Sequence, residues 1–191
     1  MGLKISVFVF VLIGYLQLAY GLRTNLTMFG NCRDMDLAYE KAPVSISKVS
    51  YDRDPDGVCN TMHVEYDIRE SSEDEHFELV LTSYQCPLGV TELCKDNPQE
   101  FVESMHCDRL HSDDSGPWHM LTSAMTNGDR CGRVQGHFNI DAAVLKIKYL
   151  DKYIEMGKGS YRVRMLFHVA NTDMSTKNMK GCCEMDFDVI D

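Results

Sequence analysis

Apolar and polar residues alternate along much of this chain. Such alternation is typical of β-strands, because successive side chains of a strand point to opposite faces. The clearest example runs from Met62 to Ile68, where every second residue is apolar and His63, Glu65 and Asp67 lie between. The same pattern predicts further strands at 77–84, 138–140, 145–149, 161–169 and 183–189, and a weaker one at 44–49. The chain is therefore expected to fold as an all-β protein.

Short turn sequences separate most of these predicted strands. Three of them contain residues that preset or tolerate turn angles, namely Asp54-Pro55-Asp56-Gly57, Asn127-Gly128-Asp129 and Gly157-Lys158-Gly159. Six to eight strands joined by such loops predict an antiparallel β-sandwich of the immunoglobulin-like kind.

Residues 87–130 lack the alternation and predict a long irregular loop. Within it, residues 98–105 are compatible with a short helix, because Pro98 suits a first helical turn. Loops of this length are usually functional or disordered. Cysteines within this stretch and at both of its ends favour an ordered loop.

The first 21 residues have the order of a secretory signal peptide. Lys4 precedes an apolar run at 5–14, and the small-residue exit Ala19-Tyr20-Gly21 follows. An uncleaved anchor is the less favoured alternative, because a spanning helix needs about 20 apolar residues and Gln17 interrupts this run. We expect a signal peptide at 1–21 and a single domain at 22–191.

All eight cysteines follow the expected signal peptide, so they reach an oxidising compartment in which disulfides form and persist. Eight cysteines allow 105 pairings, and spacing alone does not choose among them. Zinc is the competing interpretation, since His106 and His111 lie close to Cys107, but the chain has no Cys-x2-Cys unit. We therefore expect disulfides, with no metal site and no cofactor.

The chain carries a formal net charge of −10, and removal of Lys4 with the signal peptide takes it to −11. This balance argues against a nucleic-acid partner, which would require clustered lysine and arginine. The sequence Asn25-Leu26-Thr27 is an N-glycosylation sequon, and we expect Asn25 to be its acceptor.

Few features of the sequence indicate nucleophilic catalysis. Ser112, Ser115 and Ser123 lie near His111 and His119, but no nucleophile-elbow pattern surrounds any of them. The chain also lacks a glycine-rich phosphate loop and a cofactor motif. We do not expect an enzyme.

Several local motifs, in this order, resemble those of the ML (lipid-recognition) family. They span nearly the whole expected domain: Gly30-Asn31-Cys32, the pair Cys86 and Cys94, Cys107-Asp108-Arg109-Leu110, the run from Cys131 to Ile140, Gly159-Ser160-Tyr161-Arg162-Val163, and Gly181-Cys182. The resemblance implies a β-sandwich whose two sheets part to hold acyl chains in an apolar cavity.

The same resemblance implies three disulfides, which are Cys86 with Cys94, Cys107 with Cys131, and Cys32 with Cys182 or Cys183. The chain departs from the pattern it resembles in having Cys59 and adjacent cysteines at 182 and 183. Adjacent residues of a strand point to opposite faces, and adjacent cysteines rarely bond each other. We therefore predict that Cys32 and Cys59 each pair with one of these two, and the order of pairing stays open.

Candidate lipid contacts fall in two groups. The first lies in the irregular stretch, where tryptophan suits a water–lipid boundary and methionine adapts to varied ligands: Trp118, Met120, Leu121 and Met125. The second consists of inward-facing strand residues, Phe138, Ile147, Met165 and Phe167. For both groups, ordinary packing in a core is the alternative interpretation.

The expected function is that of a secreted or lysosomal lipid-binding protein, which holds or presents a glycolipid, phospholipid or sterol. Its partners would be the lipid and a membrane surface, a lipid-processing enzyme or a receptor. The alternative is an extracellular recognition or signalling module that binds a receptor through its acidic surface.

Overall fold

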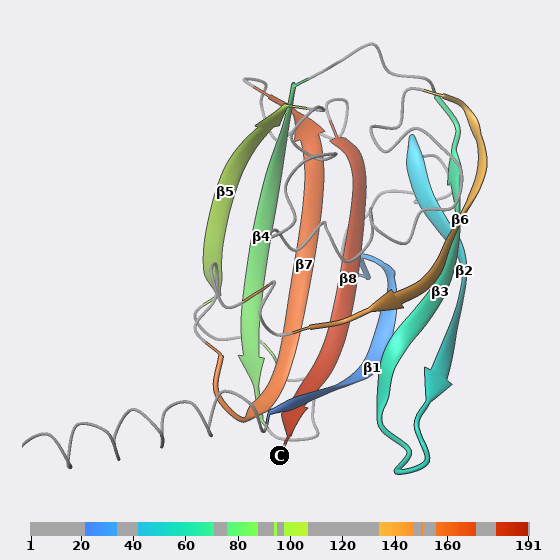
Figure 1. Ribbon diagram of the computed structural model, residues 1–191. Helices are drawn as coiled ribbons and strands as arrows, with labels where there is room; N and C mark the ends of the chain where they lie inside the picture. Colours follow the sequence, from blue (N-terminus) through green and yellow to red (C-terminus); the bar gives the residue numbers. More distant parts are fainter. Residues whose placement is uncertain are drawn as a thin grey trace, which may run out of the picture.

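Two antiparallel sheets pack face to face in the computed structural model of the protein (Figure 1), which confirms the predicted β-sandwich. The structure describes residues 22–33, 42–70, 76–87, 94, 98–106, 134–146, 150, 156–170 and 179–190. Within these residues no helix has the length and apolar character of a membrane span.

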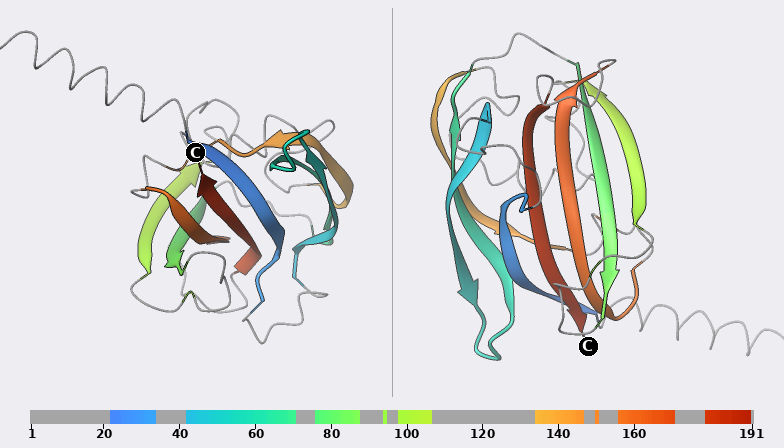
Figure 2. Two further views of the ribbon diagram at one scale, coloured as in Figure 1. Left: turned by 90° about the horizontal axis from the view of Figure 1, so that it is seen from below. Right: turned by 180° about the vertical axis from the view of Figure 1, so that it is seen from behind.

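The larger sheet has five strands in the order β1-β8-β7-β4-β5. Their bounds are β1 Arg23–Asn31, β8 Met179–Ile190, β7 Gly159–Val169, β4 His76–Cys86 and β5 Gln99–His106. The smaller sheet has three strands in the order β2-β3-β6, with bounds β2 Val44–Arg53, β3 Cys59–Ile68 and β6 Gly136–Val144. Two further views show the sheets as separate layers, with β1 between the rest of the larger sheet and the smaller one (Figure 2).

The strands predicted from alternating apolar and polar residues correspond to β2, β3, β4, β7 and β8. The predicted strand at residues 138–140 lies within β6. In β3, for example, Met62, Val64, Tyr66 and Ile68 are all buried. The predicted turn after β2 also forms, with Gly57 at a φ of 82° and its amide bonded to the Asp54 carbonyl. Such a φ favours glycine, which has no Cβ to clash. The hydrophobic pattern therefore identified most of the framework.

The structure corrects three expectations of local structure. Residues 98–105, which were compatible with a short helix, lie mostly in β5, which pairs with β4 along its length. The expected irregular loop at 87–130 therefore contains a strand. The strand expected at 145–149 does not begin at Leu145, because β6 ends at Val144 and residues 145 and 146 are outside any strand; residues 147–149 lie outside the described residues.

The pairing of β5 explains the first of these corrections. Local preference for helix is weak compared with tertiary pairing, and β5 forms eight residue pairs with β4. The side chains of β5 alternate between partly buried, as in Phe101, and exposed, as in Val102. Such alternation is expected of a strand at the edge of a sheet. The helix preference of Pro98 and its neighbours is a local property, so it could not reveal that these residues pair with β4.

Two disulfides agree with the pairing that the family resemblance implies. Cys32 bonds Cys182 across a sequence separation of 150 residues, with the Cα atoms 5.6 Å apart. Cys86 bonds Cys94, with the Cα atoms 4.5 Å apart. The first bond fixes the end of β1 to β8, and both partners are buried. Cys107 and Cys131 lie outside the described residues.

The prediction that Cys59 would pair with the remaining member of the vicinal pair was wrong, since Cys59 and Cys183 are both buried and unbridged. The Cys59 amide bonds Asn25, and Asn25 pairs with Asp188 of β8. Asp188 is five residues beyond Cys183, which is about 16 Å along a strand at roughly 3.3 Å per residue. A disulfide requires Cα atoms within about 7 Å.

Ion pairs bury two carboxylates on the outer face of the larger sheet. Glu184 and Asp186 of β8 are 0% and 2% exposed. Arg33 contacts both carboxylates, Arg162 contacts both from β7, and Arg164 contacts Glu184. These pairs compensate the desolvation that burial of a charge would otherwise impose. They also explain why β8 is buried on both of its faces.

Candidate functional site

A row of hydrogen bonds joins the two sheets beside β1, and we call it the β1 seam. The Asn25 Oδ1 atom accepts a hydrogen bond from the Cys59 amide at 3.0 Å. The Asn31 carboxamide accepts from the Ile46 amide and donates to the Ile46 carbonyl, both at 2.9 Å. Backbone groups that would be unpaired at the sheet edge are thereby satisfied, as buried polar groups require.

Tyr51 completes the β1 seam between these two asparagines. Its hydroxyl accepts a hydrogen bond from the Phe29 amide at 2.8 Å and donates one to the Phe29 carbonyl at 3.3 Å. Burial raises the pKa of the Tyr51 hydroxyl, which favours the neutral form that can donate. The seam therefore closes the sandwich along the β1 side.

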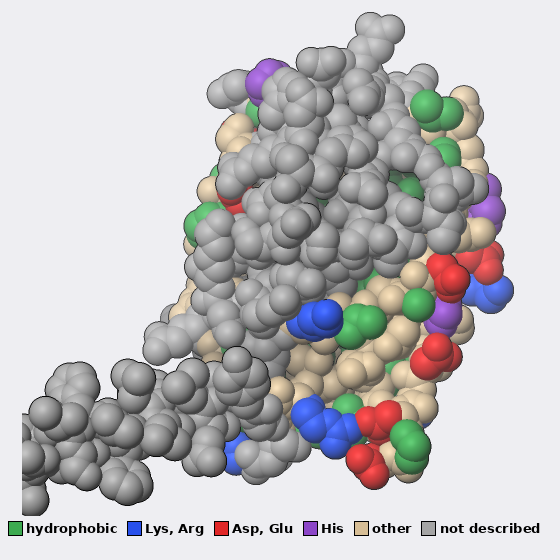
Figure 3. All heavy atoms as spheres, in the orientation of Figure 1, with side chains coloured by type: hydrophobic (Ala, Val, Ile, Leu, Met, Phe, Trp, Pro, Cys, Tyr) green, Lys and Arg blue, Asp and Glu red, His purple; other side chains and the backbone are tan. Residues whose placement is uncertain are grey.

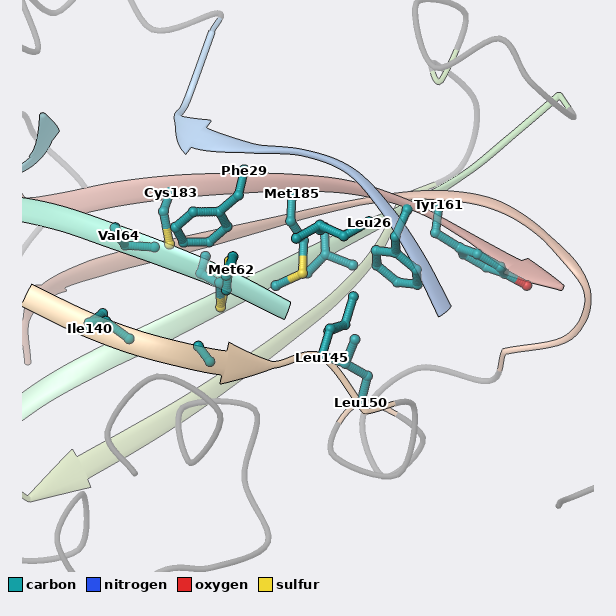
Figure 4. Close-up of a cluster of buried hydrophobic side chains, with 14 of the residues drawn as sticks. Leu26, Phe29, Met62, Val64, Ile140, Leu145, Leu150, Tyr161, Cys183 and Met185 are labelled. Carbon is teal, nitrogen blue, oxygen red and sulfur yellow. The ribbon is translucent and has the colours of Figure 1, made fainter. Parts of the chain in front are cut away.

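The interior between the sheets is tightly packed where β1 begins and β8 ends. Leu26, Leu145, Leu150, Tyr161 and Phe187 are each no more than 3% exposed. The rings of Tyr161 and Phe187 stack with centroids 5.7 Å apart. Figure 4 shows Leu26 and Tyr161 of the larger sheet in this cluster with Leu145 and Leu150, which follow β6. This part of the interior is ordinary protein core.

We call the opposite end of the interior the aromatic end. Its residues are the buried Tyr66 and the partly buried Val44, Phe138 and Phe167. Phe138 stacks on the buried Tyr66 with centroids 5.6 Å apart. Val44, Phe138 and Phe167 are each partly buried and pack against the main core.

Strand register shows that the four residues lie at the same end. Phe167 of β7 pairs with Gly181 of β8, and a Cβ placed on Gly181 would lie 3.2 Å from the Val44 Cβ atom. Val44 in turn pairs with Ile68, two residues after Tyr66, the partner of Phe138. Gly181 thus allows the two sheets to approach closely beside these aromatic rings.

Three of the sequence-predicted lipid contacts fall within the described residues. Phe138 and Phe167 come from facing sheets and lie at the aromatic end. Met165 is 1% exposed and belongs to the packed core, and its contact with a lipid stays a prediction. The other candidates lie outside the described residues: Trp118, Met120, Leu121, Met125 and Ile147.

Asn25, the expected glycosylation acceptor, is partly buried in β1 and takes part in the β1 seam. Thr27 of the same sequon donates its hydroxyl proton to the Asp186 carbonyl at 3.0 Å. Both sequon positions are therefore structured in the folded protein. Attachment of a glycan to Asn25 stays a prediction.

The serines and histidines weighed as a catalytic set all lie in 107–133, outside the described residues. Among the described residues, no group of three or more His, Cys, Asp and Glu side chains is arranged to hold a metal ion. Burial and then the nearby Glu184 raise the pKa of the Cys183 thiol to about 12, which disfavours the thiolate form.

Charged side chains gather on the outer face of the smaller sheet, along the right-hand side of Figure 3. His63 of β3 lies between Asp52 of β2 and Asp141 of β6. The sequence did not reveal this arrangement. The alternation does place His63 on the polar face of its strand, but only strand register could identify its partners.

No known protein-family model matches the chain, and no curated protein matches its sequence.

Proposed function

We propose that this protein is a secreted or lysosomal, non-enzymatic protein that binds a lipid between its two sheets. The ligand would be a glycolipid, a phospholipid or a sterol, as the resemblance to the ML family implies. Within that family, the motifs are most similar to those of the lysosomal ganglioside activator protein. The observation that carries the proposal is the aromatic end, where facing sheets present partly buried apolar side chains.

Burial of apolar surface would drive the binding of a lipid. Each methylene that leaves water contributes about 0.8 kcal/mol, so a lipid tail gains by covering the partly buried rings of Phe138 and Phe167. The β1 seam holds the sheets together on one side, and at the aromatic end Phe138 and Phe167 from facing sheets keep apolar surface that a ligand could cover. A lipid tail bound at the aromatic end would bury the apolar surface that these rings still expose.

The disulfides support the proposed location. Disulfides persist in extracellular and other oxidising compartments, and two are formed in the described residues. The expected signal peptide at 1–21 would deliver the chain to such a compartment.

Lipid retention by the secreted protein tests the proposal. The purified protein is incubated with phosphatidylcholine vesicles that contain ganglioside or cholesterol, reisolated, and examined by native mass spectrometry. We expect a bound lipid. Replacement of both rings (Phe138→Ala with Phe167→Ala) should weaken binding at least tenfold, because a buried Phe contributes about 1.5–3 kcal/mol and 1.4 kcal/mol is tenfold in affinity.

Val102→Ala is the matched control, since Val102 is 53% exposed on β5 and its truncation should leave retention unchanged. Failure of the wild-type protein to retain any of these lipids would overturn the proposal. Equal retention by the double variant would place the lipid elsewhere in the molecule. Crosslinking of lipid-free protein to a cell-surface receptor would instead favour the recognition module.

A further inference from the structure

A β-bulge lies at the centre of the smaller sheet, opposite His63. Met62 pairs with Ala143 and Val64 pairs with Ile140, so two residues of β6, Asp141 and Ala142, face one residue of β3. Ala142 has a φ of 56°, in the left-handed region that residues other than glycine rarely adopt. Such backbone strain is found preferentially at functional positions.

The His63 ring lies between two carboxylates that belong to different strands. Its Nε2 atom is 2.9 Å from Asp52 Oδ2, and its Nδ1 atom is 2.5 Å from Asp141 Oδ1. A neutral imidazole has a single N–H group, whereas the protonated ring has two. Only protonated His63 can therefore donate to both carboxylates and tie β2, β3 and β6 together.

The neutral ring has a different partner available. The Ala142 amide nitrogen is 3.4 Å from His63 Nδ1, and an amide can donate only to a ring nitrogen that carries no proton. The same Nδ1 atom thus faces Asp141 as a donor and Ala142 as an acceptor, and these two bonds exclude each other. The proton on Nδ1 decides which one forms.

Other charged side chains on this face bond one another, so the carboxylates of Asp52 and Asp141 remain the main electrostatic influence on His63. Lys48 of β2 lies near the ring, but its Nζ atom is bound to Glu65 Oε1 at 2.6 Å. His137 of β6 bonds Asp67 through Nδ1 at 2.8 Å, and its Nε2 atom lies 3.6 Å from Glu65. The bonds to Asp52 and then Asp141 raise the pKa of His63 above its ordinary value, against the smaller opposing effect of burial.

We propose that His63 is a proton-operated clamp on the three-stranded sheet. The protonated ring joins β2 to β6 through β3, and the neutral ring releases Asp141 and accepts the Ala142 amide. Because the folded protein holds the proton more tightly, the stabilisation is fully present below about pH 6.5, the ordinary pKa of histidine. It is lost as the pH rises through the pKa of the folded state.

The clamp acts on a wall of the interior, whatever that interior binds. Val64 and Ile140 flank His63 and Asp141 in sequence, and both side chains are buried between the sheets. Acidic conditions would therefore hold this wall more firmly than neutral ones. The inference goes beyond lipid binding and does not depend on it.

Nuclear magnetic resonance of the isotopically labelled protein, after removal of its signal peptide, tests the clamp between pH 5 and pH 9. We expect His63 to titrate above the ordinary histidine value, with protons on both ring nitrogens at low pH. The Ala142 amide resonance should shift with the same midpoint. Asp52→Asn and Asp141→Asn should each lower that midpoint, whereas the control Glu100→Gln, which removes an exposed carboxylate on β5, should not.

An unshifted His63 midpoint in both aspartate variants would overturn the proposal, as would an Ala142 amide that does not follow His63. Should either variant fail to fold, denaturant unfolding of wild type and His63→Gln provides a second measurement. We expect the wild-type advantage in unfolding midpoint to be largest near pH 5.5 and to shrink by pH 8.5. An advantage that is independent of pH would contradict the clamp.

Discussion

Asn31 illustrates how a single side chain can take the place of a strand. Its carboxamide has the same donor and acceptor as a peptide group, and it bonds both the amide and the carbonyl of Ile46. Ile46 therefore keeps both hydrogen bonds on the edge of β2 that faces β1. The contact joins the two sheets without a continuous ladder between them.

Replacement of this side chain (Asn31→Ala) should lower the free energy of unfolding by about 1–3 kcal/mol, because it leaves partly buried polar groups of Ile46 unpaired. Urea unfolding at constant pH measures the change. Asn139→Ala removes an exposed asparagine of β6 and should change stability by no more than about 0.5 kcal/mol. Equal losses in the two variants would show that the Asn31 bonds contribute nothing to stability.

At the residue scale, the sequence could indicate on which face a side chain lies but not what it contacts. The alternation correctly placed Met165 and Phe167 on the inner face of β7. It could not show that Glu184 and Asp186 are buried, since their partners include Arg33, which is about 150 residues away in sequence. Such pairings depend on register, and register is a property of the whole sheet.

At the scale of strands, β1 was missed because its alternation is broken. Leu26 and Phe29 are both buried, although they are three residues apart, since the register with β8 shifts between Leu26 and Met28. A bulge of this kind moves the inward-facing positions by one residue. A pattern with strict period two therefore found β3 and β7 but could not find β1.

The close approach of β8 to β2 gives a prediction at this scale. A Cβ at Gly181 would lie 3.2 Å from both the Cβ atom and the carbonyl oxygen of Val44. Gly181→Ala should therefore force the strands apart and reduce the free energy of unfolding by about 1–3 kcal/mol, as overpacking does.

Gly157→Ala is the matched control for this substitution. Nothing lies within 4 Å of a Cβ at Gly157, and its backbone is outside the left-handed region. Thermal unfolding should show a change within about 0.5 kcal/mol for this variant. A Gly181→Ala protein as stable as this control would show that the contact between β8 and β2 can relax freely.

At the scale of the whole molecule, the two disulfides differ mainly in the length of chain that they close. Cys32 and Cys182 are 150 residues apart, and Cys86 and Cys94 are 8 apart. In the chain-entropy account, the longer loop gives the larger stabilisation, about 5 kcal/mol against about 2.5 kcal/mol.

Two double variants test this difference without leaving unpaired thiols. Removal of the long-range bond (Cys32→Ala with Cys182→Ala) should lower the unfolding midpoint more than removal of the local bond (Cys86→Ala with Cys94→Ala). Guanidinium unfolding of both proteins at the same pH provides the comparison. A larger loss from the local pair would contradict the entropic explanation.

The pairing of β1 with β8 also has a consequence for biosynthesis. β1, at Arg23–Asn31, has its ladder partner at residues 183–190, so this ladder cannot form until those residues have been synthesised. During translation, β1 has no ladder partner until β8 has been made. Contacts so distant in sequence also form slowly. The larger sheet therefore cannot be completed before β8 has been made, and until then the apolar side chains of β1 lack the cover that β8 gives them.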